Sequence, residues 1–261
     1  MIEIKRMDHL LKEGRDILTE AAIVFVDAYY RDLGILTSDR EKLVLIFKEA
    51  FVPQTFYVAL MDGDVAGILA CANNKARAMH IPKETLTKQI GWLKGNLLYR
   101  YLRSEFHTPL AYPDDTAYIE AVATHTQARG KGVATRLLEY VMKNLPYQEF
   151  RLTVTDRNKV ARHIYATHGF VEIDKLQASF MERKYFNYKL YMKLDMTQAT
   201  ATTAEQPTET YTRYDATPED YENLPSDPYT TDSVAEVSEA VTPAQPSNDS
   251  QQTTPDTLTQ Q

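Results

Sequence analysis

The spacing of apolar residues changes period in the middle of the chain, and this change limits the folds available to it. Residues 118–124 (YIEAVAT) mix aromatic, β-branched and alanine residues, which predicts a largely buried strand. From residue 134 to Pro146, apolar residues recur every three or four positions, which predicts one face of a helix: Ala134, Leu137, Leu138, Val141, Met142 and Leu145. A strand therefore leads directly into a helix.

The connection between this strand and this helix is rich in glycine and cationic residues. It reads Gln127-Ala128-Arg129-Gly130-Lys131-Gly132. Glycine has no Cβ to hold a ligand away from the backbone, and a helix N-terminus offers free N–H groups and about half a positive charge. The connection therefore predicts an anion site, and phosphate is the natural ligand.

Three phosphate-binding motifs differ in what must surround the glycines. A P-loop requires Lys-Ser or Lys-Thr after its last glycine, but Val133 follows Gly132. A Rossmann G-x-G-x-x-G motif is only half matched, because Thr135 stands at its third glycine. The spacing Arg-x-x-Gly-x-Ala is matched completely by Arg129, Gly132 and Ala134. A glycine-rich turn without a ligand is the alternative.

The matched spacing resembles the acetyl-CoA pyrophosphate loop of the GNAT N-acetyltransferases, which also joins a central strand to a helix. A second string, Asn158…Ala161…Tyr165…Gly169-Phe170, is similar to the family's fourth-helix pattern N-x-x-A-x-x-x-Y-x-x-x-G-F. The resemblance covers about residues 2–196. It implies an α+β fold of GNAT type, with a central mixed sheet flanked by helices, and acetyl-CoA as the co-substrate. It also implies that the acceptor is a primary amine of a small molecule or peptide.

Composition separates one domain, residues 1–196, from a tail, residues 197–261. The tail has twelve acidic residues and one basic residue, Arg213, so it carries about −11 in a chain of net charge −7 and leaves about +4 for the domain. It is rich in Thr, Pro, Ser and Gln and has few apolar residues, so burial cannot offset the entropy of ordering. We therefore expect a disordered acidic tail.

Cysteine content and hydropathy restrict the class of protein. The single cysteine, Cys71, excludes an internal disulfide and a cysteine-based zinc site, which favours a reducing cytoplasm. We expect Cys71 to be a small buried strand residue rather than an acetyl carrier. The chain has no apolar run of signal-peptide or membrane-spanning length. We expect a cytoplasmic monomer or homodimer that binds no metal, no nucleic acid and no membrane stably.

The remaining elements follow from periodicity and capping residues. Before the central strand we predict a strand at 2–7, a helix from Ile17 to near Gly34, a helix capped by Ser38 or Asp39, and a hairpin of strands 55–61 and 65–72. After the central helix we predict a strand at 150–154, a helix from Asn158 to Gly169, and strands at 170–173 and 188–194.

A helical insertion at residues 82–104 replaces the short turn that the family usually has. We predict one helix over 83–103, with an apolar stripe at helical spacing: Leu86, Ile90, Leu93, Leu97 and Tyr101. Gly91 and Gly95 weaken it, so it must pack on the domain. A lid beside the acceptor pocket is the preferred role, and a subunit contact or a membrane-surface helix are the alternatives.

The resemblance also implies which backbone groups hold acetyl-CoA. By position, the N–H groups of Val122 and Thr124 would bind the pantetheine arm and polarise the thioester carbonyl. The pyrophosphate would lie on backbone amides from residue 129 to residue 134: Arg129, Gly130, Lys131, Gly132, Val133 and Ala134. The acceptor pocket would be formed by residues 28–51 and the insertion.

Three side chains are candidates for the chemistry or for cofactor binding. Tyr165 matches the family tyrosine that protonates the departing thiolate, and its alternative role is core packing. Asn158 is a candidate ligand of acetyl-CoA or a helix cap. Glu120, in the central strand, is a candidate base that takes the ammonium proton directly or through water, although some family members rely on water alone. A catalytically silent module that senses CoA or binds proteins is the alternative to an enzyme.

Overall fold

The computed structural model describes residues 1–178, 183 and 185–197. Seven strands of the described chain form one mixed sheet in the order β1-β2-β3-β4-β5-β7-β6. Within this described sheet, only the β4–β5 pair is parallel. The strands are β1 (Ile2–Arg6), β2 (Phe56–Met61), β3 (Asp64–Ala72), β4 (Thr116–Thr124), β5 (Glu149–Thr155), β6 (Val171–Gln177) and β7 (Tyr188–Asp195).

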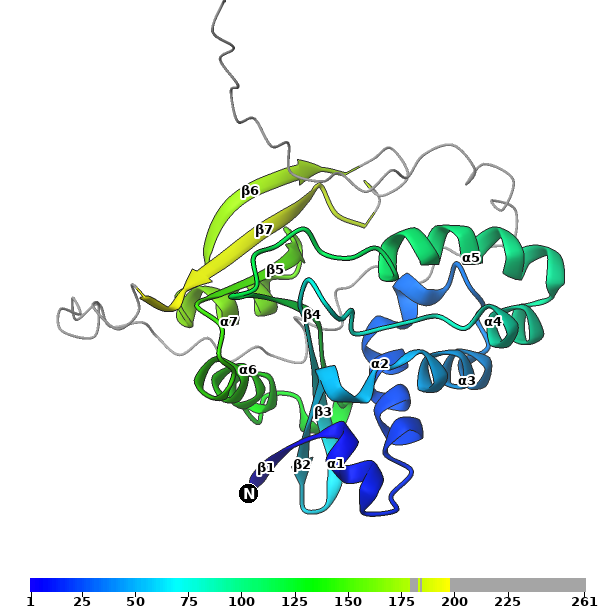
Figure 1. Ribbon diagram of the computed structural model, residues 1–261, viewed down its shortest axis with the longest axis horizontal. Coiled ribbons are helices and arrows are strands. Elements are labelled where there is room, and N and C mark those ends of the chain that lie inside the picture. The colour runs from blue at the N-terminus through cyan, green and yellow to red at the C-terminus, as the bar shows by residue number, and fades with distance from the viewer. Residues whose placement is uncertain (179–182, 184, 198–261) are drawn as a thin grey trace, which may run out of the picture.

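Helices cover both faces of the sheet and divide the core in two (Figure 1). One face packs against α1 (Met7–Lys12), α2 (Ile17–Leu33), α3 (Arg40–Ala50), α4 (Lys83–Ile90) and α5 (Trp92–Phe106). The other face packs against α6 (Val133–Asn144) and α7 (Lys159–Thr167). Two 3₁₀ turns, η1 (Pro53–Thr55) and η2 (Thr126–Ala128), complete the described elements. This arrangement confirms the predicted mixed α/β fold with a central sheet.

Local capping and turn signals were good guides to the element ends. Asp39 caps α3 by accepting a hydrogen bond from the backbone nitrogen of Lys42 at 3.2 Å. Asp62 (φ 56°) and Gly63 (φ 94°) form the two-residue hairpin between β2 and β3. The short helix α1 was missed, because the predicted first strand ran one residue too far, to Met7, and six residues give little periodicity.

The prediction of one continuous helix in the insertion is wrong. Gly91, at φ +90°, separates α4 from α5. The break changes the phase of the helical pattern, so α5 buries Gly95, Leu98 and Leu102. The predicted stripe fails there, since Leu93 is 78% exposed.

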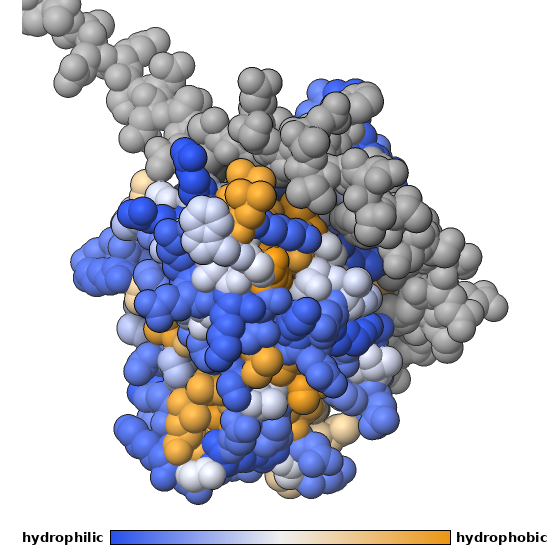
Figure 2. Space-filling view, turned by 90° about the vertical axis from the view of Figure 1, so that its right-hand side faces the viewer, coloured by the Kyte–Doolittle hydropathy of each residue, from blue (hydrophilic) through white to orange (hydrophobic). Residues whose placement is uncertain are grey.

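Gly95 lets the two insertion helices approach closely. A Cβ at this position would lie 2.7 Å from the Cα of Thr87 on α4. The pair packs beside α3, where Leu86 and Leu98 join the core of that face. On the side of the molecule formed by α3, α4 and α5, apolar patches appear among polar side chains (Figure 2).

Two predictions fall at the edges of the described chain. Strand β6, at the edge of the sheet, extends to Gln177, further than the predicted residues 170–173, and all seven of its residues are exposed. The predicted disordered tail, residues 197–261, lies outside the described residues from residue 198 onward.

Candidate active site

Strands β4 and β5 pair only at their beginnings and then separate. Thr116–Ile119 pair with Glu149–Leu152, and no pair is formed beyond Ile119 within the described sheet. On the other side of β4, the register with β3 shifts so that Glu120 is an extra, unpaired residue between Ile119 and Ala121. Such a bulge bends a strand. The bend at Glu120 therefore opens a gap between two parallel neighbours.

The backbone of β4 faces this gap at alternate residues. The N–H of His125 donates to the carbonyl oxygen of Ala66, on the β3 side, at 2.9 Å. Because successive N–H groups of a strand point to opposite sides, those of Thr124 and Val122 point away from β3, towards the gap. The hydroxyl of Tyr29, from α2, lies 3.1 Å from both the nitrogen and the carbonyl oxygen of Val122. Val122 is therefore the point where α2 contacts the open edge of the sheet.

The glycine-rich connection leads from this gap to the N-terminus of α6. Gly130 and Gly132 have φ of +73° and +76°, a conformation that residues with a Cβ rarely adopt. No atom lies within 4 Å of a Cβ built on either glycine, so both face open space. Gly132 is the N-cap residue and has no side chain with which to bind the first N–H groups of α6. These amides suit an anion.

Three tyrosines gather beside the gap. Tyr165, on α7, is 9% exposed, and burial followed by the proximity of Tyr29 and Tyr118 raises the pKa of its hydroxyl above the usual range. Burial also raises the pKa of Tyr29 to about 12. Tyr118 donates to Thr153 Oγ1 on β5 at 3.0 Å. The predicted residue Tyr165 is thus close to the same opening as Val122.

Asn158 caps helix α7. Its Oδ1 accepts a hydrogen bond from the backbone nitrogen of Ala161 at 3.1 Å. At the other end, Gly169 has φ +86° and follows the helix as its C′ residue. The capping role is therefore observed, and the proposed contact with acetyl-CoA stays a prediction.

Glu120 lies at the bulge with both carboxylate oxygens engaged. Its side chain is 4% exposed; Oε1 accepts from Arg77 Nη2 at 2.9 Å, and Oε2 accepts from the backbone nitrogen of Ala78 at 3.1 Å. Arg77 also donates to the carbonyl oxygen of Thr108 at 2.6 Å. A buried carboxylate requires such partners. The sequence does not indicate Arg77 as the partner, because it lies in a loop 43 residues away from Glu120.

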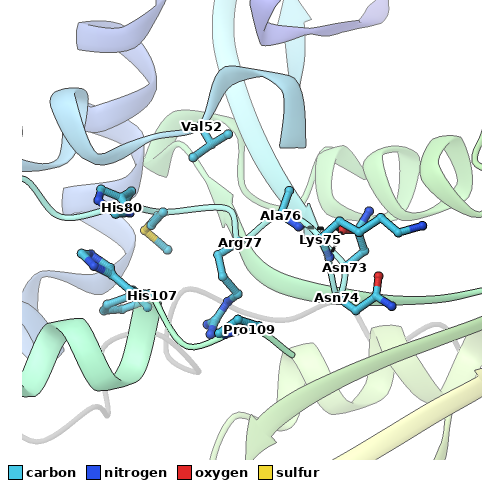
Figure 3. Close-up of a pocket in the computed structure, with 11 residues that line it drawn as sticks. Val52, Asn73, Asn74, Lys75, Ala76, Arg77, His80, His107 and Pro109 are labelled. Atoms are coloured by element: carbon cyan, nitrogen blue, oxygen red, sulfur yellow. Dashed lines mark hydrogen bonds between the residues drawn. The ribbon is translucent and has the colours of Figure 1, made fainter. Parts of the chain in front are cut away.

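A cavity of about 240 Å³ lies beside Arg77 (Figure 3). It is lined by residues 73–77, 79 and 80, before the insertion, by residues 106, 107 and 109, after it, and by Val52. His80 and His107 stack there with ring centroids 3.8 Å apart, and His107 Nε2 accepts from the backbone nitrogen of Ile81 at 2.9 Å. Burial and then His80 lower the pKa of His107. The ends of the insertion therefore meet next to the bulge residue's partner.

Cys71 and two histidines near the site make local contacts. Cys71 is 7% exposed among the residues that pack against α6, and burial raises the pKa of its thiol to about 12. His125 Nδ1 accepts from the backbone nitrogen of Gln127 at 3.3 Å. His168 Nδ1 contacts the carbonyl oxygen of Ile164 at 2.6 Å. Among the described residues, no three His, Cys, Asp or Glu side chains are placed to hold a metal.

Comparison with known proteins identifies the family. The profile of the acetyltransferase (GNAT) family matches residues 25–170. The chain belongs to this family. GNAT proteins use acyl-CoA donors and acetylate amine acceptors, usually as acetyl-CoA-dependent enzymes. The matched residues of this GNAT chain include the second half of α2, the bulge, the glycine-rich connection and α7.

Solved structures similar to this GNAT chain include three bacterial proteins. An N-acetyltransferase from Staphylococcus aureus Mu50 is 19% identical, with 74% of this chain and 100% of that one covered, at a TM-score of 0.49. A GNAT acetyltransferase from Bacillus cereus is 11% identical (75% and 97% covered, TM-score 0.44). The ribosomal-protein-S18-alanine N-acetyltransferase of Escherichia coli is 13% identical (75% and 94% covered, TM-score 0.46). No curated protein matches the sequence.

No helix in the described part of this GNAT chain has the length and apolar character needed to cross a membrane.

Proposed function

We propose that this protein transfers the acetyl group of acetyl-CoA to a primary amine of a small molecule or peptide, by direct attack within a ternary complex. The observation that carries the proposal is the combination of two features at one end of β4. The strand bends away from β5 at Glu120, and it then leads through two glycines of positive φ into an N-terminus with free amides. One feature suits a pantetheine arm and the other a pyrophosphate.

The backbone would provide most of the contacts to acetyl-CoA. The pyrophosphate would lie on the amides of Arg129, Gly130, Lys131, Gly132, Val133 and Ala134. The edge of β4 would hold the pantetheine arm through Val122 and Thr124, with the thioester carbonyl polarised by an N–H donor. Because Tyr29 already bonds to Val122, its hydroxyl would have to release that amide when the thioester binds.

Tyr165 is the proposed general acid. The neutral amine attacks the thioester carbon, the C–S bond breaks as the intermediate collapses, and the thiolate takes the proton of the Tyr165 hydroxyl. Burial raises the pKa of this hydroxyl, so it keeps its proton at neutral pH until the thiolate forms. Tyr165 recovers a proton from the attacking nitrogen through solvent. One further proton is released from the original ammonium.

The role of Glu120 as the base stays a prediction. The hydrogen bonds of its carboxylate limit the access of an acceptor amine. An acceptor would have to compete with Arg77 or reach the carboxylate through water. The ion pair supports a second role, as a positioning residue: it joins the bulge to the segment before the insertion, and Arg77 extends the link to Thr108 after the insertion. Both ends of the insertion are thereby tied to the bulge, which supports its proposed place beside the acceptor pocket.

Release of free thiol from acetyl-CoA tests the proposal. Polyamines, aminoglycosides and peptides with free N-termini serve as acceptors, and each acetylated product is identified by its mass. We expect thiol release that depends on one class of amine and yields an equal amount of acetylated amine. Tight binding of acetyl-CoA without transfer to any amine would instead favour a catalytically silent module.

The proposed cytoplasmic location is consistent with a buried free cysteine.

A further inference from the structure

Asp32 lies on the last turn of α2, three residues after Tyr29. Residues at this spacing are neighbours on one face of a helix, with about 5–6 Å between their Cβ atoms. Tyr29 contacts Val122 at the gap in the sheet, and the charge of Asp32 contributes to the raised pKa of the Tyr29 hydroxyl. Asp32 therefore lies on the α2 side of the gap, opposite α6 and α7.

Asp32 is an exposed residue, and its carboxylate forms no hydrogen bond or ion pair with any described residue. Although water reaches it, surrounding protein desolvates it and raises the pKa of the carboxyl group, while neighbouring Arg31 opposes this change. Glu120 differs in both respects, since it is almost fully buried and three hydrogen bonds engage its oxygens. Of these two carboxylates near the gap, only Asp32 is open to a ligand.

The end of α2 that carries Asp32 is firmly anchored. The hydroxyl of Tyr30 donates to the carbonyl oxygen of Ser38 at 2.8 Å, and the guanidinium of Arg40 lies 3.9 Å from the Tyr30 ring centroid. Arg40 also forms an ion pair with Asp27 on α2. These contacts fix the turn between α2 and α3. The Asp32 carboxylate is consequently presented at the gap by a rigid element, as a substrate-binding group must be.

We propose that Asp32 is a catalytic residue that receives the ammonium group of the acceptor and takes one proton from it. The inference rests on the proposed function and makes its acceptor more specific: the amine is an alkylamine that is cationic at neutral pH. In the step, R–NH₃⁺ and the carboxylate become R–NH₂ and a carboxylic acid, and the neutral amine then attacks the thioester carbon. The carboxylic acid returns its proton to water after transfer. Overall, R–NH₃⁺ and acetyl-CoA give the acetamide, free CoA and one H⁺.

The pH dependence of Asp32→Asn separates a lost base from a damaged fold. When the base is present, its carboxylate reacts with the ammonium form of the acceptor. In that case kcat/KM is constant between the pKa of the carboxyl group and the pKa of the amine. Without the base, only the neutral fraction of the amine reacts, so kcat/KM rises about tenfold per pH unit below the pKa of the amine. Glu3→Gln is the matched control, because it removes one exposed carboxylate from β1, at the edge of the sheet away from the gap. Glu120→Gln tests the other carboxylate.

The assay uses the full chain, acetyl-CoA and the alkylamine with the highest wild-type rate from the thiol-release panel. At about pH 7 we expect Asp32→Asn to lower kcat/KM by about 10²- to 10⁴-fold relative to the wild type. At about pH 9 we expect this deficit to be about 100-fold smaller. We expect its acetyl-CoA affinity to be unchanged, Asp32→Glu to restore part of the activity, and Glu3→Gln to behave like the wild type.

An Asp32→Asn enzyme with the wild-type rate, or with an equal deficit at both pH values, would overturn the assignment while leaving the proposed function intact. A pH-dependent deficit in Glu120→Gln alone would assign the base to Glu120 instead. A wild-type protein that binds acetyl-CoA but acetylates no amine would overturn both proposals.

Discussion

The hydroxyl of Tyr29 is 3.1 Å from the backbone nitrogen of Val122 and 3.1 Å from its carbonyl oxygen. It therefore accepts one hydrogen bond and donates another to the same residue, at the place where β4 no longer pairs with β5. In the absence of acetyl-CoA, a side chain from α2 thus satisfies the groups that the proposed thioester contact requires. This relationship joins the proposed acceptor side of the domain to the proposed cofactor side.

Tyr29→Phe is expected to strengthen acetyl-CoA binding. The substitution frees the Val122 amide, so the thioester no longer exchanges one hydrogen bond for another. One such bond is worth about 0.5–1.5 kcal/mol, or about a 2- to 10-fold lower Kd by calorimetry. Tyr30→Phe is the control, because that hydroxyl bonds to Ser38 and not to β4. Weaker binding by Tyr29→Phe would mean that the hydroxyl itself holds the cofactor.

Tyr165→Phe is expected to reduce turnover by about 10²- to 10⁴-fold with little change in acetyl-CoA affinity. The hydroxyl would act on charge that develops only as the thiolate leaves, so its loss should affect kcat rather than ground-state binding. The phenyl ring keeps the packing against Phe170, whose ring centroid is 5.8 Å away. If turnover stays within a factor of about two of the wild type, Tyr165 only packs the core.

Cys71 is expected to resist thiol reagents in the folded protein. Burial raises the pKa of its thiol from 9.0 to about 12, so the thiolate fraction near neutral pH falls by about 10³-fold, in addition to steric protection. Because the folded protein keeps this proton to higher pH than the unfolded chain does, the stabilising effect is present below pH 9.0 and is lost towards pH 12. Alkylation followed by mass spectrometry should be fast only in denaturant. Rapid labelling of the native protein would refute the burial.

Gly95→Ala is expected to destabilise the protein, although alanine is the better helix former by about 1 kcal/mol. The new methyl group would meet Thr87 at 2.7 Å and force α4 and α5 apart, which typically costs about 1–3 kcal/mol. Urea unfolding measures the net effect, with Arg100→Ala on the exposed side of α5 as the control. A more stable Gly95→Ala protein would show that the helix pair is loosely packed.

Features that depend on residues close together in the sequence could be predicted. The cap at Asp39, the hairpin at Asp62-Gly63, the apolar face of α6 and the cap at Asn158 each arise within a few positions of the chain, so periodicity and capping rules locate them. The loop between β4 and α6 was predictable for the same reason. Its two glycines have positive φ in the structure, which the sequence analysis did not predict.

Features that depend on distant residues were missed. Arg77 and Glu120 are 43 positions apart, and Tyr29 and Val122 are 93 positions apart, so no local pattern indicates either contact. No sequence pattern distinguishes Asp32 from other charged residues at the ends of helices, and only the fold brings it near the gap. The break at Gly91 was missed because an isolated glycine is compatible with a helix, and it shifted the phase of everything that follows in the insertion.

The central claim is that the loop before α6 binds the pyrophosphate of acetyl-CoA, and calorimetry of Gly132→Asp tests it most directly. The new carboxylate would stand where the phosphates approach the backbone. Loss of one charge-assisted contact costs about 1.5–3 kcal/mol, so we expect Kd to rise at least about tenfold. Gly14→Asp is the matched control, because Gly14 also has a positive φ, +81°, with no atom within 4 Å of its Cβ position. It should bind like the wild type. An unchanged Kd in folded Gly132→Asp would contradict the claim.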